Sequence, residues 1–139
     1  GGKYYNHIVM DFKNGLVEVR DTETKEQLDT DKLFVKNSIW FQSDNTKPIF
    51  PTAQAMNDID EAMYFNKAEW ANRANVDPML TDPYSLSAPN FTPKAGSPAL
   101  TGGAAPEASA DNFFDATATF VGAIGATDWT AGWTQYPQN

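Results

Sequence analysis

Two short apolar runs near the N-terminus share the same order of polar and apolar positions. The first spans residues 5–10 and the second spans residues 36–41. When the runs are aligned, Asn6 matches Asn37, Ile8 matches Ile39, and two apolar residues follow each isoleucine. We predict that these runs are equivalent strands in two successive coils of a parallel β stack, with the two asparagine amides bonded to the turn backbone at one corner. A meander of antiparallel hairpins would give a similar pattern and remains the structural alternative.

Each run belongs to a larger predicted strand unit. Residues 4–12 are rich in strand-forming side chains, and Asn14-Gly15 is a turn signal because both residue types accept positive φ angles. Residues 16–20 alternate imperfectly, as a half-buried strand does. The charged residues 21–32 lack the glycine and terminal glutamate of a calcium loop, so we interpret them as a solvated loop inserted between the coils.

The periodicity becomes helical after residue 51. Thr52 can cap a helix, and Asn66 starts a pattern that resembles a capping box. This pattern predicts a second short helix over residues 67–73, with Trp70 as its buried anchor. The first helix has its predicted apolar face at spacings of three and four: Met56, Ile59 and Met63. We interpret three acidic residues as its wet face: Asp58, Asp60 and Glu61.

The second half of the chain is irregular in pattern. Five X-Pro pairs between residues 77 and 98 disfavour helix, and we predict that residues 76–106 form a surface segment pinned by its apolar side chains. Residues 116–120 read as a strand, and the aromatic residues that follow are predicted to fold back as a cap. The predicted organisation is one domain over residues 1–139: strand coils 4–41, a helical excursion 52–73, a Pro-rich surface segment 76–106 and an aromatic capping tail 111–139.

Composition removes several classes of partner and chemistry. The chain has 139 residues, which suits a single domain, and a formal net charge of -8. Phosphate binding needs clustered lysine and arginine, so we expect neither a nucleic-acid partner nor an anionic membrane surface. No apolar run reaches the roughly 18 residues of a membrane helix. We see no signal peptide, and Gly1-Gly2 reads as a tag remnant or a cut site that leaves a native leader undecided.

The sequence offers little for catalysis. Cysteine is absent and His7 is the only histidine, so we expect no metal and no cofactor. A catalytic role for His7 would require an orienting acid such as Asp11, and nothing in the sequence places the two together. No nucleophile elbow, phosphate loop or dinucleotide fingerprint is present. We therefore assign no catalytic residue, and the sequence favours a non-catalytic protein without deciding the point.

Three aromatic residues near the C-terminus form the one candidate ligand-binding set. These are Trp129, Trp133 and Tyr136. They can form a platform that stacks on sugar rings, or they can pack over the core as part of the cap. The two readings are separable, because stacking aromatics must be exposed to solvent and capping aromatics must be buried.

Two segments resemble known protein families. Residues 93–99, Pro-Lys-Ala-Gly-Ser-Pro-Ala, are similar to a P-x-x-G-S-P-A segment that follows the last coils of many secreted bacterial right-handed parallel β-helix proteins of the pectate-lyase-like superfamily. Residues 122–134 resemble the G-A-x-G-x-x-D-W-T-x-G-W-T ending of uncharacterised secreted or surface proteins, many from Bacteroidetes and marine bacteria.

The resemblance implies a mainly β fold: a short parallel β-helix-like stack of C-terminal coils with a one-to-two-helix excursion and a C-terminal cap. It also implies that the chain ends a longer solenoid, so that the N-terminal coil exposes an apolar end, which we expect to be hidden by self-association. The implied function is a secreted or cell-surface structural or interaction domain; the alternative is a glycan-binding or polysaccharide-degrading β-helix fragment. Some relatives cleave acidic polysaccharides with calcium-binding aspartates and a basic residue, but Asp11, Glu18 and Arg20 do not form such a set.

Overall fold

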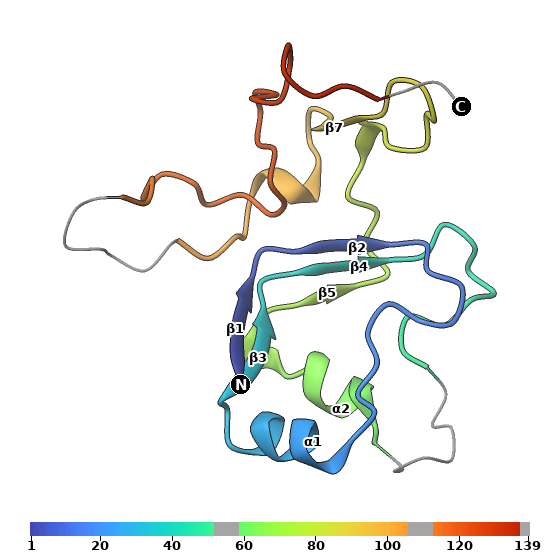
Figure 1. Ribbon diagram of the computed structural model, residues 1–139, viewed down its shortest axis with the longest axis vertical. Coiled ribbons are helices and arrows are strands. Elements are labelled where there is room, and N and C mark those ends of the chain that lie inside the picture. Colours follow the sequence, from blue (N-terminus) through green and yellow to red (C-terminus); the bar gives the residue numbers. More distant parts are fainter. Residues whose placement is uncertain (52–58, 106–112, 137–139) are drawn as a thin grey trace.

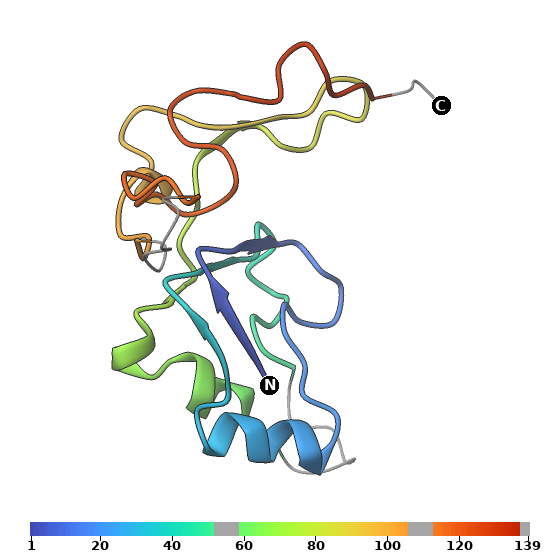
Figure 2. The same cartoon turned by 60° about the vertical axis from the view of Figure 1, so that its left-hand side comes forward.

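The computed structural model describes residues 1–51, 59–105 and 113–136. The described residues form two lobes, one above the other in Figure 1. The lower lobe consists of residues 1–51 and 59–75, and the upper lobe consists of residues 76–105 and 113–136. Figure 2 shows that the same two-lobe arrangement persists when the molecule is turned.

Parallel strands organise the lower lobe. Strand β1 (Gly2–Tyr5) pairs with β3 (Leu33–Lys36). Strand β2 (Ile8–Met10) pairs with β4 (Ile39–Phe41), which in turn pairs with the two-residue strand β5 (Arg73–Ala74). In the β2–β4 ladder Ile8 lies opposite Ile39, as the alignment of the two runs predicted, and the antiparallel meander is excluded for this pair.

The predicted fold class, a short parallel β-helix-like stack, is wrong. In the described part of the chain the strands are two to four residues long and lie in three separate small sheets of two, three and two strands, which do not stack into a solenoid. The matched runs specified a local register between two strands, but they did not specify a repeating coil. After β5 the chain leaves for the upper lobe, where β6 (Leu80–Asp82) and β7 (Asn90–Pro93) pair antiparallel.

The two matched asparagines occupy equivalent left-handed corners between strands. Asn6 has φ 61° and Asn37 has φ 54°, a region that asparagine tolerates better than most residues. Their amides bond to the upper lobe rather than to their own turns. Asn6 Nδ2 donates to the Ala104 carbonyl at 2.9 Å, and Asn37 Nδ2 donates to the Gly102 carbonyl at 3.1 Å. The asparagine corners therefore join the two lobes.

The charged segment after residue 20 contains a helix, so the prediction of a solvated loop is wrong. Helix α1 (Thr22–Asp29) is capped by the Asp21 carboxylate, which accepts from the Thr24 N–H at 2.6 Å. Leu28 is its fully buried residue, so the helix shows almost no apolar period in the sequence. Lys25 and Asp29 form an i,i+4 ion pair at 2.7 Å, and this spacing of opposite charges is the one feature of the sequence that indicated a helix here.

Residues 59–73 contain less helix than predicted. Helix α2 (Glu61–Phe65) is capped by Asp60 and followed by the 3₁₀ helix η1 (Ala68–Trp70). Trp70 is buried, as predicted. The predicted helix face is wrong at Met63, which is 56% exposed, and the predicted wet face is wrong at Glu61, which is 5% exposed. Three residues assigned to that helix lie outside the described residues: Thr52, Met56 and Asp58.

The burial of Glu61 has a specific partner. Its Oε1 accepts a hydrogen bond from the Val19 backbone N–H at 3.0 Å. Residues 16–20 form irregular chain, so the strand predicted there is wrong; Val19 bonds to this carboxylate and not to a neighbouring strand. The bond satisfies a buried backbone donor that no ladder serves.

An aromatic core fills the lower lobe. Edge-to-face contacts join Trp40 to Phe65 at 5.8 Å and Phe65 to Trp70 at 5.8 Å between ring centroids. The buried members of this core are Leu16, Val19, Leu28, Phe34, Trp40, Ile59, Tyr64, Phe65 and Trp70. Asn72 ties the core's edges together: its Nδ2 donates to the carbonyls of Val35 and Phe65, and its Oδ1 accepts from the Ser38 N–H.

A second, smaller cluster joins the lobes. It contains Ile39 from β4, Ala99 from the 3₁₀ helix η2 (Pro98–Leu100), and Val121. The Ser97 hydroxyl donates to the Pro78 carbonyl at 2.6 Å and accepts from the Ala99 N–H at 3.0 Å. The P-x-x-G-S-P-A segment therefore has a structural role here, since it forms the turn that places Ala99 on the sheet. Residues 116–120 form turns and irregular chain, so the strand predicted there is wrong.

Candidate functional site

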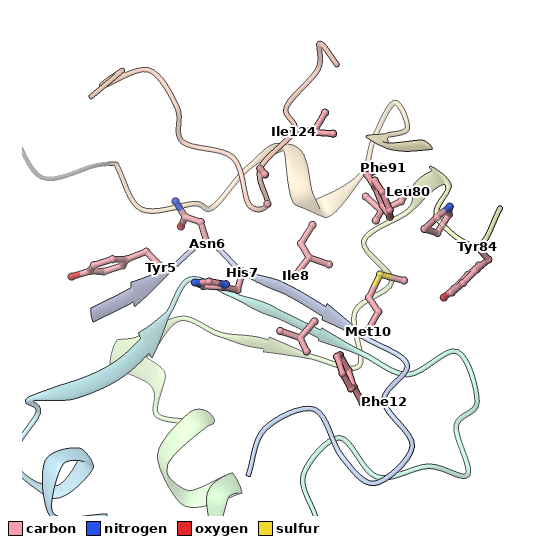
Figure 3. Close-up of a pocket in the computed structure, with 14 residues that line it drawn as sticks. Tyr5, Asn6, His7, Ile8, Met10, Phe12, Leu80, Tyr84, Phe91 and Ile124 are labelled. Carbon is pink, nitrogen blue, oxygen red and sulfur yellow. The ribbon is translucent and has the colours of Figure 1, made fainter. Parts of the chain in front are cut away.

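A groove lies between β2 and the upper lobe. Its volume is about 840 Å³. Figure 3 shows Ile8 pointing from β2 toward the upper lobe, with Leu80 and Phe91 on the opposite wall near Met10. The lining residues are Tyr5, Asn6, His7, Ile8, Val9, Met10, Phe12, Leu80, Pro83, Tyr84, Phe91, Gly122, Ala123 and Ile124. The groove is therefore mainly apolar, with a few polar groups at its ends.

Strand alternation explains why β2 contributes to both the core and the groove. Successive side chains on a strand point to opposite faces. Val9 packs against the aromatic core of the lower lobe, whereas Ile8 packs against the second cluster on the other face. The second cluster covers the sheet at Ile39, but its cover ends before Met10, which remains half-exposed. The open part of that face is the floor of the groove.

Strand β2 is also the outer strand of its sheet. The strand order is β2–β4–β5, so one side of β2 has no strand partner among the described residues. The His7 carbonyl accepts from the Ile39 N–H at 2.8 Å, and the Asp11 N–H donates to the Phe41 carbonyl at 3.2 Å. These alternate residues face β4, so the backbone groups of Ile8 and Met10 face the other way. The groove therefore runs beside a strand edge that can accept another strand.

A second hollow continues along β1. Its volume is about 570 Å³, and it shares Tyr5, Asn6 and His7 with the first. Its other lining residues are Lys3, Tyr4, Ala104, Ala105, Phe114, Asp115 and Ala118. Strand β1 is likewise an outer strand, because its described partner is β3 alone. We call the two hollows together the edge groove.

A polar cluster closes the β2 end of the edge groove. Asp11, with φ 56°, accepts from the Ser43 N–H and from the Ser43 hydroxyl, each at 2.8 Å, and its second carboxylate oxygen accepts from the Tyr84 hydroxyl. Burial acts to raise the pKa of Asp11, but the bonds from Tyr84 and Ser43 outweigh it and leave that pKa below its ordinary value. Burial and the bond to Asp11 raise the pKa of Tyr84 to about 12. Both pKa shifts therefore favour an ionised Asp11 carboxylate beside a neutral Tyr84 phenol.

His7 lies at the junction of the two hollows and lines both of them. Its backbone N–H donates to the Ser38 hydroxyl at 3.1 Å, and its ring lies 5.9 Å from the Tyr4 ring. Asp11 directs its carboxylate to Ser43 and Tyr84. Among the described residues, no group of three or more histidine, aspartate or glutamate side chains is placed to hold a metal ion. No helix in the described ranges has the length and apolar character needed to cross a membrane.

The three aromatic residues singled out in the sequence lie in the upper lobe, outside the edge groove. Trp129 is 54% exposed, Trp133 is 68% exposed and Tyr136 is 39% exposed. The two tryptophan rings are 5.4 Å apart and inclined by 39°. Trp129 Nε1 donates to the Ala123 carbonyl, and Trp133 Nε1 donates to the Trp129 carbonyl. These rings meet the exposure condition for a stacking platform. The buried hydrophobic residues of this tail are Val121 and Ile124.

Sequence reasoning missed the residues that form the groove. In the sequence, Leu80, Tyr84 and Phe91 are ordinary apolar members of the Pro-rich surface segment 76–106. The available signal was the alternation at Ile8 and Met10, which leaves apolar side chains on both faces of a strand at the edge of a sheet. That pattern indicates that a second layer covers the strand, but it does not say which residues supply the layer.

Comparisons with known proteins add no further assignment. No protein-family model matches the chain, and neither a curated protein nor a solved structure matches it. The family resemblance of residues 93–99 and 122–134 stays a prediction from the sequence.

Proposed function

We propose that the protein is a non-catalytic interaction domain that pairs the open edge of β2 with an extended polypeptide strand. The observation that carries this proposal is the coincidence of a strand edge and an apolar groove at the same residues, Ile8–Met10. Backbone groups of an edge strand supply hydrogen bonds, and side-chain pockets beside it supply specificity. A secreted or cell-surface location is part of the proposal and rests on the sequence resemblance alone.

Self-association through the N-terminal edge is one form of this pairing. Two copies can pair through the same edge about a two-fold axis. Because each copy carries a net charge of -8, the test is made in about 1 M NaCl, where the Debye length falls to ~3 Å. Mass by light scattering is measured from low to high micromolar protein, together with amide hydrogen exchange at Ile8 and Met10.

Met10→Pro is the decisive variant for this test. Proline removes the Met10 N–H, which faces away from β4, so the β2–β4 ladder keeps its bonds. Met10→Ala is the matched control, because it shortens the same side chain and keeps the N–H. We expect association and slowed amide exchange at Ile8 in the wild type and in Met10→Ala, and neither in Met10→Pro, which has no amide hydrogen at position 10. A protein that stays monomeric at every concentration contradicts self-association.

A second candidate function is glycan binding by Trp129 and Trp133. The observation that favours it is the exposure of both rings, which a capping role does not require. Stacking on an aromatic ring contributes about 0.5–1.5 kcal/mol, or about two- to tenfold in affinity per ring. Affinity electrophoresis in gels containing soluble polysaccharides compares the wild type with Trp129→Ala/Trp133→Ala and with Leu86→Ala, an exposed apolar residue elsewhere. Retardation of all three proteins to the same degree, or of none, contradicts the platform.

A further inference from the structure

The charge around the edge groove is unbalanced at its Tyr84 end. Asp11 contacts Tyr84 and Ser43, and Asp44 follows Ser43 in the chain. Asp77, whose carboxylate accepts from the Met79 N–H at 2.7 Å, adds to the negative field at Tyr84. Three carboxylates therefore surround this end.

Positive charge does little to offset these carboxylates. Lys47 is the basic residue that acts on Asp11, and its Nζ lies 4.0 Å from Asp44. The described residues that line the β2 hollow include no lysine and no arginine. The end of the groove therefore carries a net negative field that a positively charged ligand group can neutralise.

The shape of the groove fits one extended segment. A volume of about 840 Å³ is in the range that encloses a drug-sized ligand, of roughly 300–1,000 Å³, and holds a few side chains. An extended chain gains backbone hydrogen bonds at Ile8 and Met10 in addition to its side-chain contacts.

A second copy of the chain is a poor occupant at physiological ionic strength. Each copy has a net charge of -8, and the N-terminal edge contributes Lys3 as its lysine or arginine between residues 2 and 10. At 0.15 M salt the Debye length is about 8 Å, so carboxylates near the groove still repel an acidic partner. Complementary charge steers association and suppresses wrong partners.

We infer that the edge groove binds an extended segment of a different protein, in which alternating apolar residues are followed by lysine or arginine. This inference rests on the proposed function. The apolar residues fill the space between Met10, Leu80 and Phe91, and the backbone pairs with β2. Parallel pairing continues the direction of the β2–β4–β5 ladder, so the segment runs toward Tyr84 and places its basic residues among the carboxylates.

Three synthetic peptides test the inference. All share an alternating valine–threonine run, and they end in two lysines, two glutamines or two glutamates. Dissociation constants are measured by calorimetry at physiological salt, and amide exchange at Ile8 and Met10 locates the bound peptide. We expect the lysine peptide to bind about tenfold more tightly than the glutamate peptide, because exposed ion pairs contribute about 0.2–1 kcal/mol each. The difference should vanish in about 1 M NaCl.

Charge-removing variants test the acidic end without disturbing its turns. In Asp44→Asn/Asp77→Asn the retained Oδ1 can still accept the bonds from Thr46 and Met79. Asp21→Asn/Glu23→Gln is the control, because it removes two charges from the first turn of α1, at the far end of the lower lobe (Figure 1). We expect the first variant alone to lose most of the preference for lysine.

The outcomes separate this inference from the proposed function. If the three peptides bind equally and all slow exchange at Ile8 and Met10, edge pairing stands and the charge selection is wrong. If the control variant loses the preference as much as the Asp44/Asp77 variant, the preference is a net-charge effect and the inference is overturned. If no peptide and no second copy slows exchange at these amides, both the inference and edge pairing are wrong.

Discussion

We expect Asn72→Ala to lower the free energy of unfolding by more than the loss of a small side chain alone would. The Asn72 amide makes three hydrogen bonds: to the Val35 carbonyl at 2.7 Å, to the Phe65 carbonyl at 3.0 Å, and from the Ser38 N–H at 2.9 Å. Ser38 is fully buried. The substitution removes all three bonds and leaves the Ser38 N–H without this partner in a site closed to solvent.

The size of the effect follows from those contacts. Each hydrogen bond contributes about 0.5–1.5 kcal/mol, and a buried donor left unsatisfied costs about 1–3 kcal/mol. We therefore expect the free energy of unfolding to fall by roughly 3 kcal/mol. For a chain of this size, that loss corresponds to a decrease in Tm of about 10 °C.

Urea unfolding followed by tryptophan fluorescence measures this loss, because Trp40 and Trp70 are buried in the same core. Asn66→Ala is the control: Asn66 is exposed at the C-terminal end of α2, and its replacement should change the free energy of unfolding by less than about 0.5 kcal/mol. An Asn72→Ala protein within about 1 kcal/mol of Asn66→Ala, with an unchanged m-value, would refute the bridging role.

Two further predictions concern the groove. The folded state raises the pKa of Tyr84 to about 12 from 10.0, so the stability that the neutral phenol contributes is complete below pH 10.0 and is lost as pH rises toward 12. The pKa of Asp11 is lowered from 3.8, so its contribution is complete above pH 3.8 and is lost as pH falls through the folded pKa. Tyr84→Phe should therefore flatten the alkaline fall in unfolding free energy, and a fall as steep as that of the wild type contradicts the contact. Gly122 has φ 96°, and a Cβ there would lie 2.9 Å from Ile8 Cδ1, whereas Gly132 has φ 91° and open space around it. In urea unfolding, Gly122→Ala should have a free energy of unfolding about 1 kcal/mol lower than Gly132→Ala. Both substitutions introduce backbone strain, but only the first crowds the groove floor at Ile8. Equal losses would show that the Ile8 side chain moves aside without loss of stability.

The local pairing of strands was predictable from sequence, because two features coincide in it. An asparagine accepts the left-handed corner, and the isoleucine two residues later fixes which face of the strand is buried. The same pattern did not predict the fold class, since a register between two strands says nothing about the third. The predicted burial of Trp70 is confirmed because few environments other than a core accommodate so large an apolar ring.

Helix α1, the burial of Glu61 and the groove could not be predicted from the sequence, each for a physical reason. Helix α1 buries essentially one residue, Leu28, so its sequence has no apolar stripe to detect. Glu61 is buried by a bond to Val19, 42 residues away, and charge alone predicts exposure. The groove depends on β2, the β6–β7 hairpin and Gly122, which only the tertiary fold brings together.

The contacts of Asn6 bear on the order in which the two lobes fold. Asn6 exchanges two hydrogen bonds with Ala104, 98 residues later, and its carbonyl accepts from the Gly122 N–H. Contacts of such long sequence separation form slowly, because a large loop must close before they form. A chain that emerges N-terminus first can build the aromatic core from residues 1–75 while the edge groove still lacks its upper wall. The edge groove is thus completed only when the upper lobe joins the lower lobe, and until then the β2 edge is exposed to pairing with other chains.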